Sequence, residues 1–500
     1  MATTPLVQIE RTEIDGVPVF WTPVDGPRMA SLMFRVGRAD EPAHQCGITH
    51  LVEHLALAPL TQQPYNHNGF VSAIRTAFHA SGTDDQLVEF MHTVVASLRS
   101  LPAERTLMER RILLQEAAGR APGASGLLRW FRHGFRGQGL IGAEEIGLYW
   151  LGPEPIQAWA AEWLTAENAA VWWSGPPPAG LRLDLPQGER KAVAETPLIP
   201  GLEAPARTDL GGTGTSTGFL GSRSTGTRIM LDILTVRLRQ ELRFERGLIY
   251  DVGADYEPVG ADVATISVGM DCRREDAPEV AGRVLGTLEA LRDSGPTVDE
   301  IAREAGQFAE SARHPPGHLG FLDSTAHDEL LGRTREDART IVDQYLNTTP
   351  DQVRAAAATA LETAILFAPP GPYDERIHAY PAWSAHRITG RTVRPTGWLV
   401  GPRARKDRLV IGREGVSWIS PEGGANTVRF DECVALRHWD GPIRELWGAD
   451  GFRVVVNAAA WRGGAAVVEE IDKAVDPALV ACGEHGIGAL EDKATPGVQG

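Results

Sequence analysis

Cysteine is scarce in this chain of 500 residues, which has only four of them. Cys46, Cys272, Cys433 and Cys482 lie far apart and form no Cys-x-x-Cys pair. This spacing argues against a cysteine zinc site and against a disulfide framework, so we expect a protein of the reducing cytoplasm. Cys46 lies close before His50, but we interpret it as a small buried core residue, because cysteine is among the most buried residue types.

An excess of positive charge is also missing. The chain has 49 lysines and arginines against 65 aspartates and glutamates, which gives a formal net charge of -16 at pH 7. A protein that binds nucleic acid without sequence preference needs a basic face, so this balance argues against that function. No stretch approaches the ~20 apolar residues of a membrane helix, and the N-terminus lacks the pattern of a secretory signal. We therefore expect no nucleic-acid partner and no membrane partner.

What remains is the composition of an ordinary globular protein. Hydrophobic residues make up 43% of the chain and charged residues 23%, which is typical of folded domains in aqueous solution. Since 500 residues exceed what a single core can hold, the length predicts two to four domains.

The segment from Gly47 to His54 carries the strongest chemical signal. His50 and His54 are about one helical turn apart, so both imidazoles lie on one face of a helix with Glu53 beside them. This HxxEH arrangement is the reverse of the commoner HExxH and has the geometry of a zinc site with a built-in general base. The numbers of histidine and acidic residues predict only ~0.05 chance occurrences of the motif.

Residues 103–119 are predicted to form a helix that carries two further carboxylates. Glu109 and Glu116 lie two turns apart on one face, and without the histidine pair we would interpret them as a solvated charged stripe. A zinc site with two histidines needs a third protein ligand. Glu116 is the candidate for that ligand, and Glu109 for a carboxylate that orients it or a histidine. The predicted core face of this helix comprises Leu107, Ile112, Leu113 and Ala117.

Periodicity divides the chain into two similar α+β units, each an antiparallel sheet packed with helices, and a smaller β-rich unit. Pro/Gly-rich stretches mark the boundaries between them. The predicted organisation is a first α+β domain at 1–187, a linker at 188–206, a second such domain at 207–372, a linker at 373–392, a small β-rich unit at 393–482 and a disordered tail at 483–500.

These features resemble the pitrilysin/insulinase zinc metallopeptidases, a family of inverzincins that includes mitochondrial processing peptidase and compact bacterial homologues. The resemblance covers roughly residues 7–370. Besides the HxxEH motif and the helix with two glutamates, it rests on a Leu-Thr-x-Glu-Asn turn at 164–168. It also rests on the segment 242–250, which is similar to the family's LRExRGLxY.

The resemblance implies a complete zinc site. His50, His54 and Glu116 would bind Zn²⁺, Glu53 would be the general base, and Glu109 would support the ligands.

The resemblance also implies roles for Arg243 and Tyr250, which would contact the substrate and the developing oxyanion. Taken alone, each residue would favour a structural interpretation, an ion pair with a nearby Glu for Arg243 and a half-buried core phenol for Tyr250, and only their spacing in the family segment favours the functional one.

The two halves of such peptidases share one α+β fold and enclose a chamber that admits unfolded peptides. Substrate there adds as an extra strand to an exposed sheet edge. The segment Val71-Ser72-Ala73 resembles that edge strand, with Ser72 in the place of the family's Asn. Only 61 residues separate His54 from Glu116, fewer than relatives usually have, so we expect a helix to be missing between the motif and Gly69.

The sequence therefore predicts a zinc-dependent endopeptidase that hydrolyses unfolded peptides. With two peptidase-type units, the chain is expected to pair with another such chain, as a homodimer or as a heterodimer with an inactive sister chain. Two alternatives stay open. The chain could be a non-catalytic or partner-dependent subunit of a heteromeric processing peptidase. It could instead be a scaffold that acts through its C-terminal β-rich unit, which is similar to a small PH-like barrel.

Overall fold

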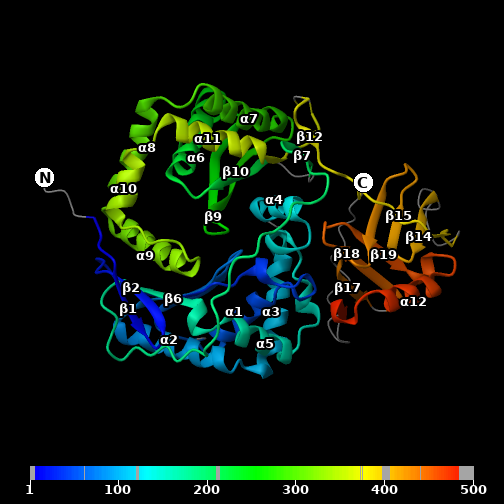
Figure 1. The fold of residues 1–500 in the computed structure, drawn as a ribbon, viewed down its shortest axis with the longest axis horizontal. Coiled ribbons are helices and arrows are strands. Elements are labelled where there is room, and N and C mark those ends of the chain that lie inside the picture. Colours follow the sequence, from blue (N-terminus) through cyan, green and yellow to red (C-terminus); the bar gives the residue numbers. More distant parts are fainter. Residues whose placement is uncertain are drawn as a thin grey trace.

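The computed structural model has three units that follow one another along the chain, each with its own hydrophobic core (Figure 1). The first two units face each other, and the third lies beside them. Among the described residues, no helix is long and apolar enough to cross a membrane. The predicted disordered tail, 483–500, lies outside the described residues. The structure describes residues 6–60, 62–119, 123–209, 214–371, 373, 375–396, 406–439 and 441–482.

The first unit is built on a six-stranded sheet. Its strands are β1 (Glu10–Ile14), β2 (Val17–Trp21), β3 (Arg28–Phe34), β4 (Asn66–Val71), β5 (Thr76–Gly82) and β6 (Ala169–Trp173). The strand order is β1-β2-β6-β3-β5-β4, so β4 is an edge strand. Its helices are α1 (Ile48–Leu57), α2 (Asp84–Arg99), α3 (Thr106–Gly119), α4 (Ala124–His133) and α5 (Pro153–Trp163).

Turn chemistry sets the start of this sheet. Asp15 and Gly16 have φ values of 51° and 83°, as a type I′ turn requires of its two central residues. The hairpin pairs Ile14 with Val17 and turns Val17 into the core. The Asp-Gly pair thus fixes the register of β2, which places Val17 and Val19 in the core of the first unit.

The second unit repeats the plan with a second six-stranded sheet. Its strands are β7 (Ala206–Thr208), β8 (Thr215–Ser222), β9 (Ile249–Pro258), β10 (Val263–Cys272), β11 (Ile365–Phe367) and β12 (His378–Ala379). The strand order is β12-β7-β11-β8-β10-β9, which leaves β9 at an edge. Its helices are α6 (Thr225–Leu238), continued by a π-helical segment η8 (Arg239–Glu245), α7 (Ala277–Asp293), α8 (Val298–Ser311), α9 (Pro315–Leu330), α10 (Ala338–Leu346) and α11 (Pro350–Glu362).

Helix α9, which the sequence pattern did not predict, joins the two units. It follows α8 of the second unit, but Leu322 and Ala326 pack into a cluster with Phe20 and Met33 of the first sheet. Its sequence begins with Pro-Pro-Gly, a pattern that is typical of a loop. The sheet of the first unit is therefore covered on one face by a helix from the second (Figure 1).

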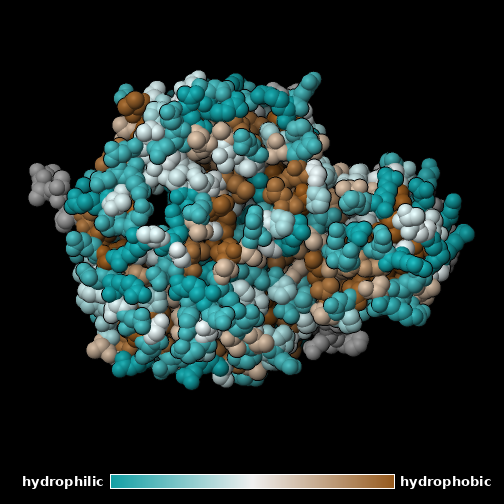
Figure 2. Space-filling model, in the orientation of Figure 1, coloured by the Kyte–Doolittle hydropathy of each residue, from teal (hydrophilic) through white to brown (hydrophobic). Residues whose placement is uncertain are grey.

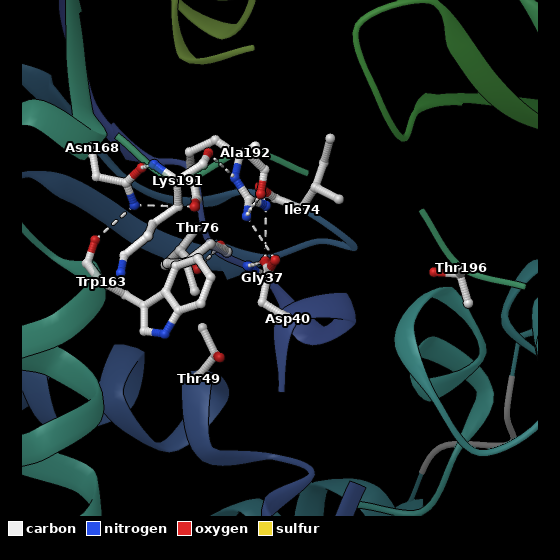
Figure 3. A network of polar contacts seen from close by, with 12 residues as sticks. Gly37, Asp40, Thr49, Ile74, Thr76, Trp163, Asn168, Lys191, Ala192 and Thr196 are labelled. Atoms are coloured by element: carbon white, nitrogen blue, oxygen red, sulfur yellow. Dashed lines mark hydrogen bonds and ion pairs between the residues drawn. The ribbon is translucent and has the colours of Figure 1, made fainter. Parts of the chain in front are cut away.

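The segment 188–206, predicted as a linker, is anchored to the first unit at Lys191 and Ala192. The buried guanidinium of Arg35 donates hydrogen bonds to the carbonyls of both residues. It also forms an ion pair with Asp40 at 2.7 Å, and Asp40, Lys191 and Ala192 lie together in this network (Figure 3). A buried ion pair therefore holds a segment that has no regular secondary structure near this point.

The third unit consists of two four-stranded sheets and one long helix, α12 (Gly464–Ala474). One sheet contains β13 (Arg391–Val393), β14 (Arg408–Gly412), β15 (Gly415–Ile419) and β16 (Ala425–Arg429). The other contains β19 (Arg453–Asn457), β18 (Ile443–Gly448), β17 (Cys433–Trp439) and β20 (Val480–Cys482). Pairing among the described strands does not close them into one barrel, and the PH-like character of this unit stays a prediction.

Candidate metal centre

Helix α1 brings the three residues of the HxxEH motif together. The ring centroids of His50 and His54 are 5.1 Å apart. One ligand atom from each histidine and one carboxylate oxygen of Glu53 all lie within 4.8 Å of one another. The one-turn spacing in the sequence thus becomes a cluster of two nitrogens and an oxygen on a single helical face.

The N-terminus of α1 is fixed by a buried carboxylate. Glu41 accepts hydrogen bonds from the backbone N–H groups of Gly47 and Thr49, at 2.7 and 2.9 Å. These N–H groups have no acceptor within the helix, and a negative charge at this end also interacts favourably with the positive end of the helix dipole. Gly47 itself has a φ of 99°, a conformation that favours glycine. Helix α1 therefore starts at a defined position just before the first histidine.

Helix α3 supplies the two glutamates that the sequence analysis singled out. Oε2 of Glu109 lies 3.4 Å from Nδ1 of His54, and Arg105 donates to the other oxygen of Glu109 at 2.7 Å. Oε2 of Glu116 lies 3.8 Å from Nε2 of His54. Glu109 thus holds one nitrogen of this imidazole, while Glu116 faces the other.

The predicted core face of α3 was wrong. Leu107 and Ile112 are each 44% exposed and Ala117 is exposed, so that only Leu113 of the predicted set is buried. Because α3 turns its two glutamates toward α1, the polar face of the helix points inward and part of its apolar face points outward. The buried residues of α3 are Thr106, Glu109, Arg110 and Leu113.

A third carboxylate, which the sequence analysis missed, holds the other histidine. Oε1 of Glu145 lies 3.2 Å from Nδ1 of His50 and 3.4 Å from Nη1 of Arg38. Burial alone would raise the pKa of Glu145. The hydrogen bond to His50 and the charge of Arg38 outweigh burial and lower this pKa to about 2. Glu145 lies 95 residues from His50 along the chain, between two short 3-10 turns, and no local pattern in the sequence pairs them.

Glu53 lies against the edge strand β4. Its side chain is buried, and a β-carbon added to Gly69 would lie 2.1 Å from its Oε1. Burial raises the pKa of Glu53 to about 7. The negative charges of Glu116 and Glu109 also raise this pKa, whereas the charge of His50 lowers it. A raised pKa makes this carboxylate a stronger base, as the role of a general base requires.

The edge strand differs from the prediction at Ser72. Strand β4 ends at Val71, and the backbone N–H of Ser72 donates to the carbonyl of Arg75 within the turn that follows. Gly69, rather than Ser72, is the strand residue next to Glu53. Between α1 and β4 the described residues hold only a short 3-10 turn (Ala58–Leu60), in agreement with the helix expected to be missing there.

The donor set fits Zn²⁺. Imidazole nitrogens and carboxylate oxygens are ligands that zinc accepts, and histidine ligands commonly have their second nitrogen bound by a carboxylate. Here the carboxylate of Glu145 contacts Nδ1 of His50, and that of Glu109 contacts Nδ1 of His54. Nε2 of His54 faces Glu53 at 3.8 Å. Among the described residues, the three side chains whose ligand atoms lie close enough to share one metal ion are His50, Glu53 and His54. Glu116, the predicted third ligand, is not in this group.

The predicted substrate residues lie in the second unit. The guanidinium of Arg243, on η8, is 5.2 Å from the ring centroid of Tyr250 and 3.8 Å from Asp251. Tyr250 is 74% exposed, so it is not a half-buried core phenol. Within the described part of the chain, no hydrogen bond or ion pair joins Arg243 or Tyr250 to the residues of the HxxEH motif.

A large cavity lies away from the metal centre. It measures about 1100 Å³ and opens between the first two units, on the side of α9 and α10 (Figure 2). None of the residues that line it belongs to the HxxEH motif. Its polar lining includes Arg75, Arg228, Glu257, Asp323 and His327. It is a space between the units, with charges of both signs.

Comparisons with known proteins address the fold. A family model described as the peptidase M16 inactive domain matches residues 222–308, whereas no curated protein sequence matches the chain. A solved peptidase M16 inactive domain from Pseudomonas fluorescens aligns with a TM-score of 0.60 and 16% identity, over 72% of this chain and 97% of its own. The fold is of the M16 type.

Two other solved structures show the same similarity. A protease from Helicobacter pylori aligns with a TM-score of 0.58 and 16% identity, over 73% of this chain and 100% of its own. A chain of complex III from Candida albicans aligns with a TM-score of 0.59 and 13% identity, over 72% and 95%. At these identities the likeness concerns the fold alone. The matched segment 222–308 contains Arg243 and Tyr250 but not the HxxEH motif.

Proposed function

We propose that this chain is a zinc-dependent endopeptidase that hydrolyses unfolded peptides, with Glu53 as its general base. The observation that carries the proposal is the surroundings of Glu53. Its buried carboxyl group has a pKa raised to about 7 and stands beside two histidines, each with its Nδ1 near a carboxylate.

In this proposal His50, His54 and Glu116 hold the metal. A bound Zn²⁺ would polarise the scissile carbonyl and lower the pKa of a water molecule. Glu53 takes the proton of the attacking water and returns it to the leaving amine, a role typically worth about 10²- to 10⁴-fold in rate. Glu109 keeps the imidazole of His54 turned so that its Nε2 faces Glu53 and Glu116.

The edge of the first sheet supplies a place for the peptide. Among the described strands, β4 pairs with β5 and with no other, so its other side can accept a peptide as a further strand. Gly69 brings the β4 backbone against Glu53, which would place a peptide bound there within reach of the base. Arg243 and Tyr250 are the proposed donors to the oxyanion, where removal of one donor commonly costs about 10²-fold or more.

A second candidate function is that of a subunit whose activity needs a partner. One of the similar structures is a chain of complex III, and the family model that matches describes an inactive domain. Pairing with a second chain, identical or related, is part of both proposals. The cytoplasmic location expected from the few, widely spaced cysteines stays a prediction.

The test is cleavage of a mixed library of unfolded peptides by the purified chain with Zn²⁺. Glu53→Gln removes the base and keeps the shape, and Glu154→Gln is the matched control on the surface of the same unit. We expect the parent and the control to cut and Glu53→Gln not to cut, although all three bind zinc. If none of them cuts and all bind one zinc per chain, the isolated chain is not a peptidase, and the partner-dependent subunit becomes the better explanation.

A further inference from the structure

The C-terminal unit packs against the segment of the first unit that carries Glu145. Ala435 on β17 is fully buried and shares a hydrophobic cluster with Ile146, the residue after Glu145. The same cluster contains Cys46, which precedes helix α1 by two positions. The C-terminal unit therefore reaches both the chain that enters the metal-binding helix and the chain that carries the carboxylate on His50.

A buried arginine adds polar contacts to this interface. The guanidinium of Arg437 on β17 contacts the rings of Tyr149 and Trp439, 4.1 and 3.5 Å from their centroids. Its Nη1 is 3.6 Å from Oε1 of Glu144, and the hydroxyl group of Tyr149 donates to the same oxygen at 2.9 Å. Glu144 and Ile146, the two neighbours of Glu145, thus both contact the C-terminal unit.

The segment that carries Glu145 has little regular structure of its own. It joins two short 3-10 turns, Gly137–Gly142 and Ile146–Tyr149. The first unit holds its inner side: Arg38 donates to the carbonyl of Ala143 at 3.1 Å, and the N–H of Gly147 donates to the carbonyl of Cys46 at 2.9 Å. The C-terminal unit holds the outer side of this segment. The position of the segment therefore depends on contacts with both the first unit and the C-terminal unit.

We propose that the C-terminal unit acts as a clamp that positions Glu145 against His50 and thereby sets the affinity of the metal centre. Arg437 and Ala435 are positioning residues, since they act through the segment 144–146 and do not touch the ligands. The inference rests on the proposed function, because it presumes that His50 binds zinc. A carboxylate on the distal nitrogen of a histidine ligand fixes its orientation, and loss of such a partner typically weakens metal binding about 10- to 100-fold.

The experiment measures the zinc dissociation constant of the full chain by competition with a chelating dye. Glu145→Gln removes the carboxylate and Arg437→Met removes the clamp contact. Arg429→Met is the matched control, since Arg429 pairs with Asp431 inside the C-terminal unit. We expect Glu145→Gln to weaken zinc binding about 10- to 100-fold and Arg437→Met about 10-fold. The control should bind as the parent does.

A double variant separates positioning from general stability. If Arg437 acts through Glu145, Glu145→Gln combined with Arg437→Met binds zinc no more weakly than Glu145→Gln alone. A purely structural role of Arg437 would lower the melting temperature of Arg437→Met and leave its zinc dissociation constant unchanged. If Arg437→Met does not fold, Glu144→Gln decides, because Glu144 is half exposed and its loss still removes the ion pair.

Three results would overturn the clamp: an unchanged dissociation constant in Glu145→Gln, an unchanged one in Arg437→Met or in Glu144→Gln, or losses that simply add in the double variant. Each presumes that the parent binds zinc. A parent that binds none refutes the proposed function itself, so the two failures are distinguishable.

Discussion

Gly69 and Glu53 are in direct contact across the gap between the edge strand and helix α1. A β-carbon on Gly69 would lie 2.1 Å from Oε1 and 2.8 Å from Cδ of Glu53. Since Gly69 has no positive φ, its backbone conformation suits any residue. The glycine is needed for space, because any side chain at this position would push the carboxylate away from the histidines.

Gly69→Ala is therefore expected to displace Glu53 while leaving the metal ligands in place. We predict a fall in kcat of about 10²-fold, the lower end of what a general base contributes, with zinc affinity within a few-fold of the parent. Peptide cleavage kinetics and zinc titration measure the two effects. Gly180→Ala is the control, since a β-carbon there meets no atom within 4 Å. Equal activity of both alanine variants would show that the position of Glu53 is not critical.

The contact of Glu109 with His54 gives a second prediction. Glu109→Gln exchanges an acceptor of the imidazole N–H for an amide and leaves Arg105 without its ion pair. We expect zinc affinity to fall about 10- to 100-fold, measured by competition with a chelator. Glu104→Gln, on an exposed position one turn earlier, should have no effect. A parent-like affinity of Glu109→Gln would contradict the supporting role of Glu109.

Glu257 of β9 ties the two large units together. It accepts a hydrogen bond from the backbone N–H of Ala73 at 3.1 Å and from Nη2 of Arg129 at 2.5 Å. Arg129 is almost fully buried, so Glu257→Gln leaves an uncompensated charge at the contact. We predict a loss of about 2–3 kcal/mol in the free energy of unfolding, below the usual range for a fully buried pair because Glu257 is partly exposed.

Urea unfolding of the full chain checks this loss. Asp255→Asn is the control, because Asp255 lies on the same strand and its hydrogen bond from the hydroxyl group of Ser125 is long, at 3.4 Å. Replacement of Arg129 by Met in the Glu257→Gln background should recover part of the stability, since it removes the unpaired charge. A loss below about 0.5 kcal/mol, the usual effect of a surface substitution, is incompatible with a buried ion pair between the units.

The stability of the chain should fall with acidification because of His133. Burial lowers the pKa of His133 to about 4, assisted by the charges of Arg132, Arg129 and Arg136 and opposed by its hydrogen bond to the Pro197 carbonyl. Between pH 6.5 and 4 the unfolded chain thus binds the proton and the folded chain does not. The contribution of His133 to the free energy of unfolding is complete above pH 6.5. It is lost as the pH falls toward 4, by about 3 kcal/mol in all.

His133→Asn keeps a donor for the Pro197 carbonyl and cannot be protonated. We expect it to be less stable than the parent at pH 7.5 and to lose less stability between pH 7.5 and 5, as followed by the melting temperature. His386→Asn, at an exposed position, should keep the pH dependence of the parent. If His133→Asn and the parent fall in parallel, the histidine is protonated in the folded chain.

The local parts of the candidate site could be predicted from the sequence. His50, Glu53 and His54 are neighbours on one helical turn, so their spacing alone places them together. Glu109 and Glu116 were found by the same periodicity, and the structure turns both toward His54. The apolar residues of the same helix were misjudged, because hydrophobic periodicity assumes an apolar interior and α3 buries carboxylates instead.

Contacts between distant segments could not be predicted. Glu145 comes from a stretch without helical or strand periodicity, and α9 begins with prolines and glycine and packs on a sheet of the other unit. Ser72 was placed in the edge strand by resemblance, whereas the turn after Val71 puts Gly69 next to Glu53. In each case the position of the residue depends on packing between elements.

The sequence by itself determined the elements whose information is local: the hairpin at Asp15-Gly16, the histidine pair on α1 and the carboxylate pair on α3. Only the tertiary structure decided that Glu145 holds His50, that α9 joins the two units and that the C-terminal unit packs on the segment carrying Glu145. The physical reason is that helix and turn periodicities act over a few residues. The burial that brings Glu145 to His50 is set by surfaces assembled from the whole chain.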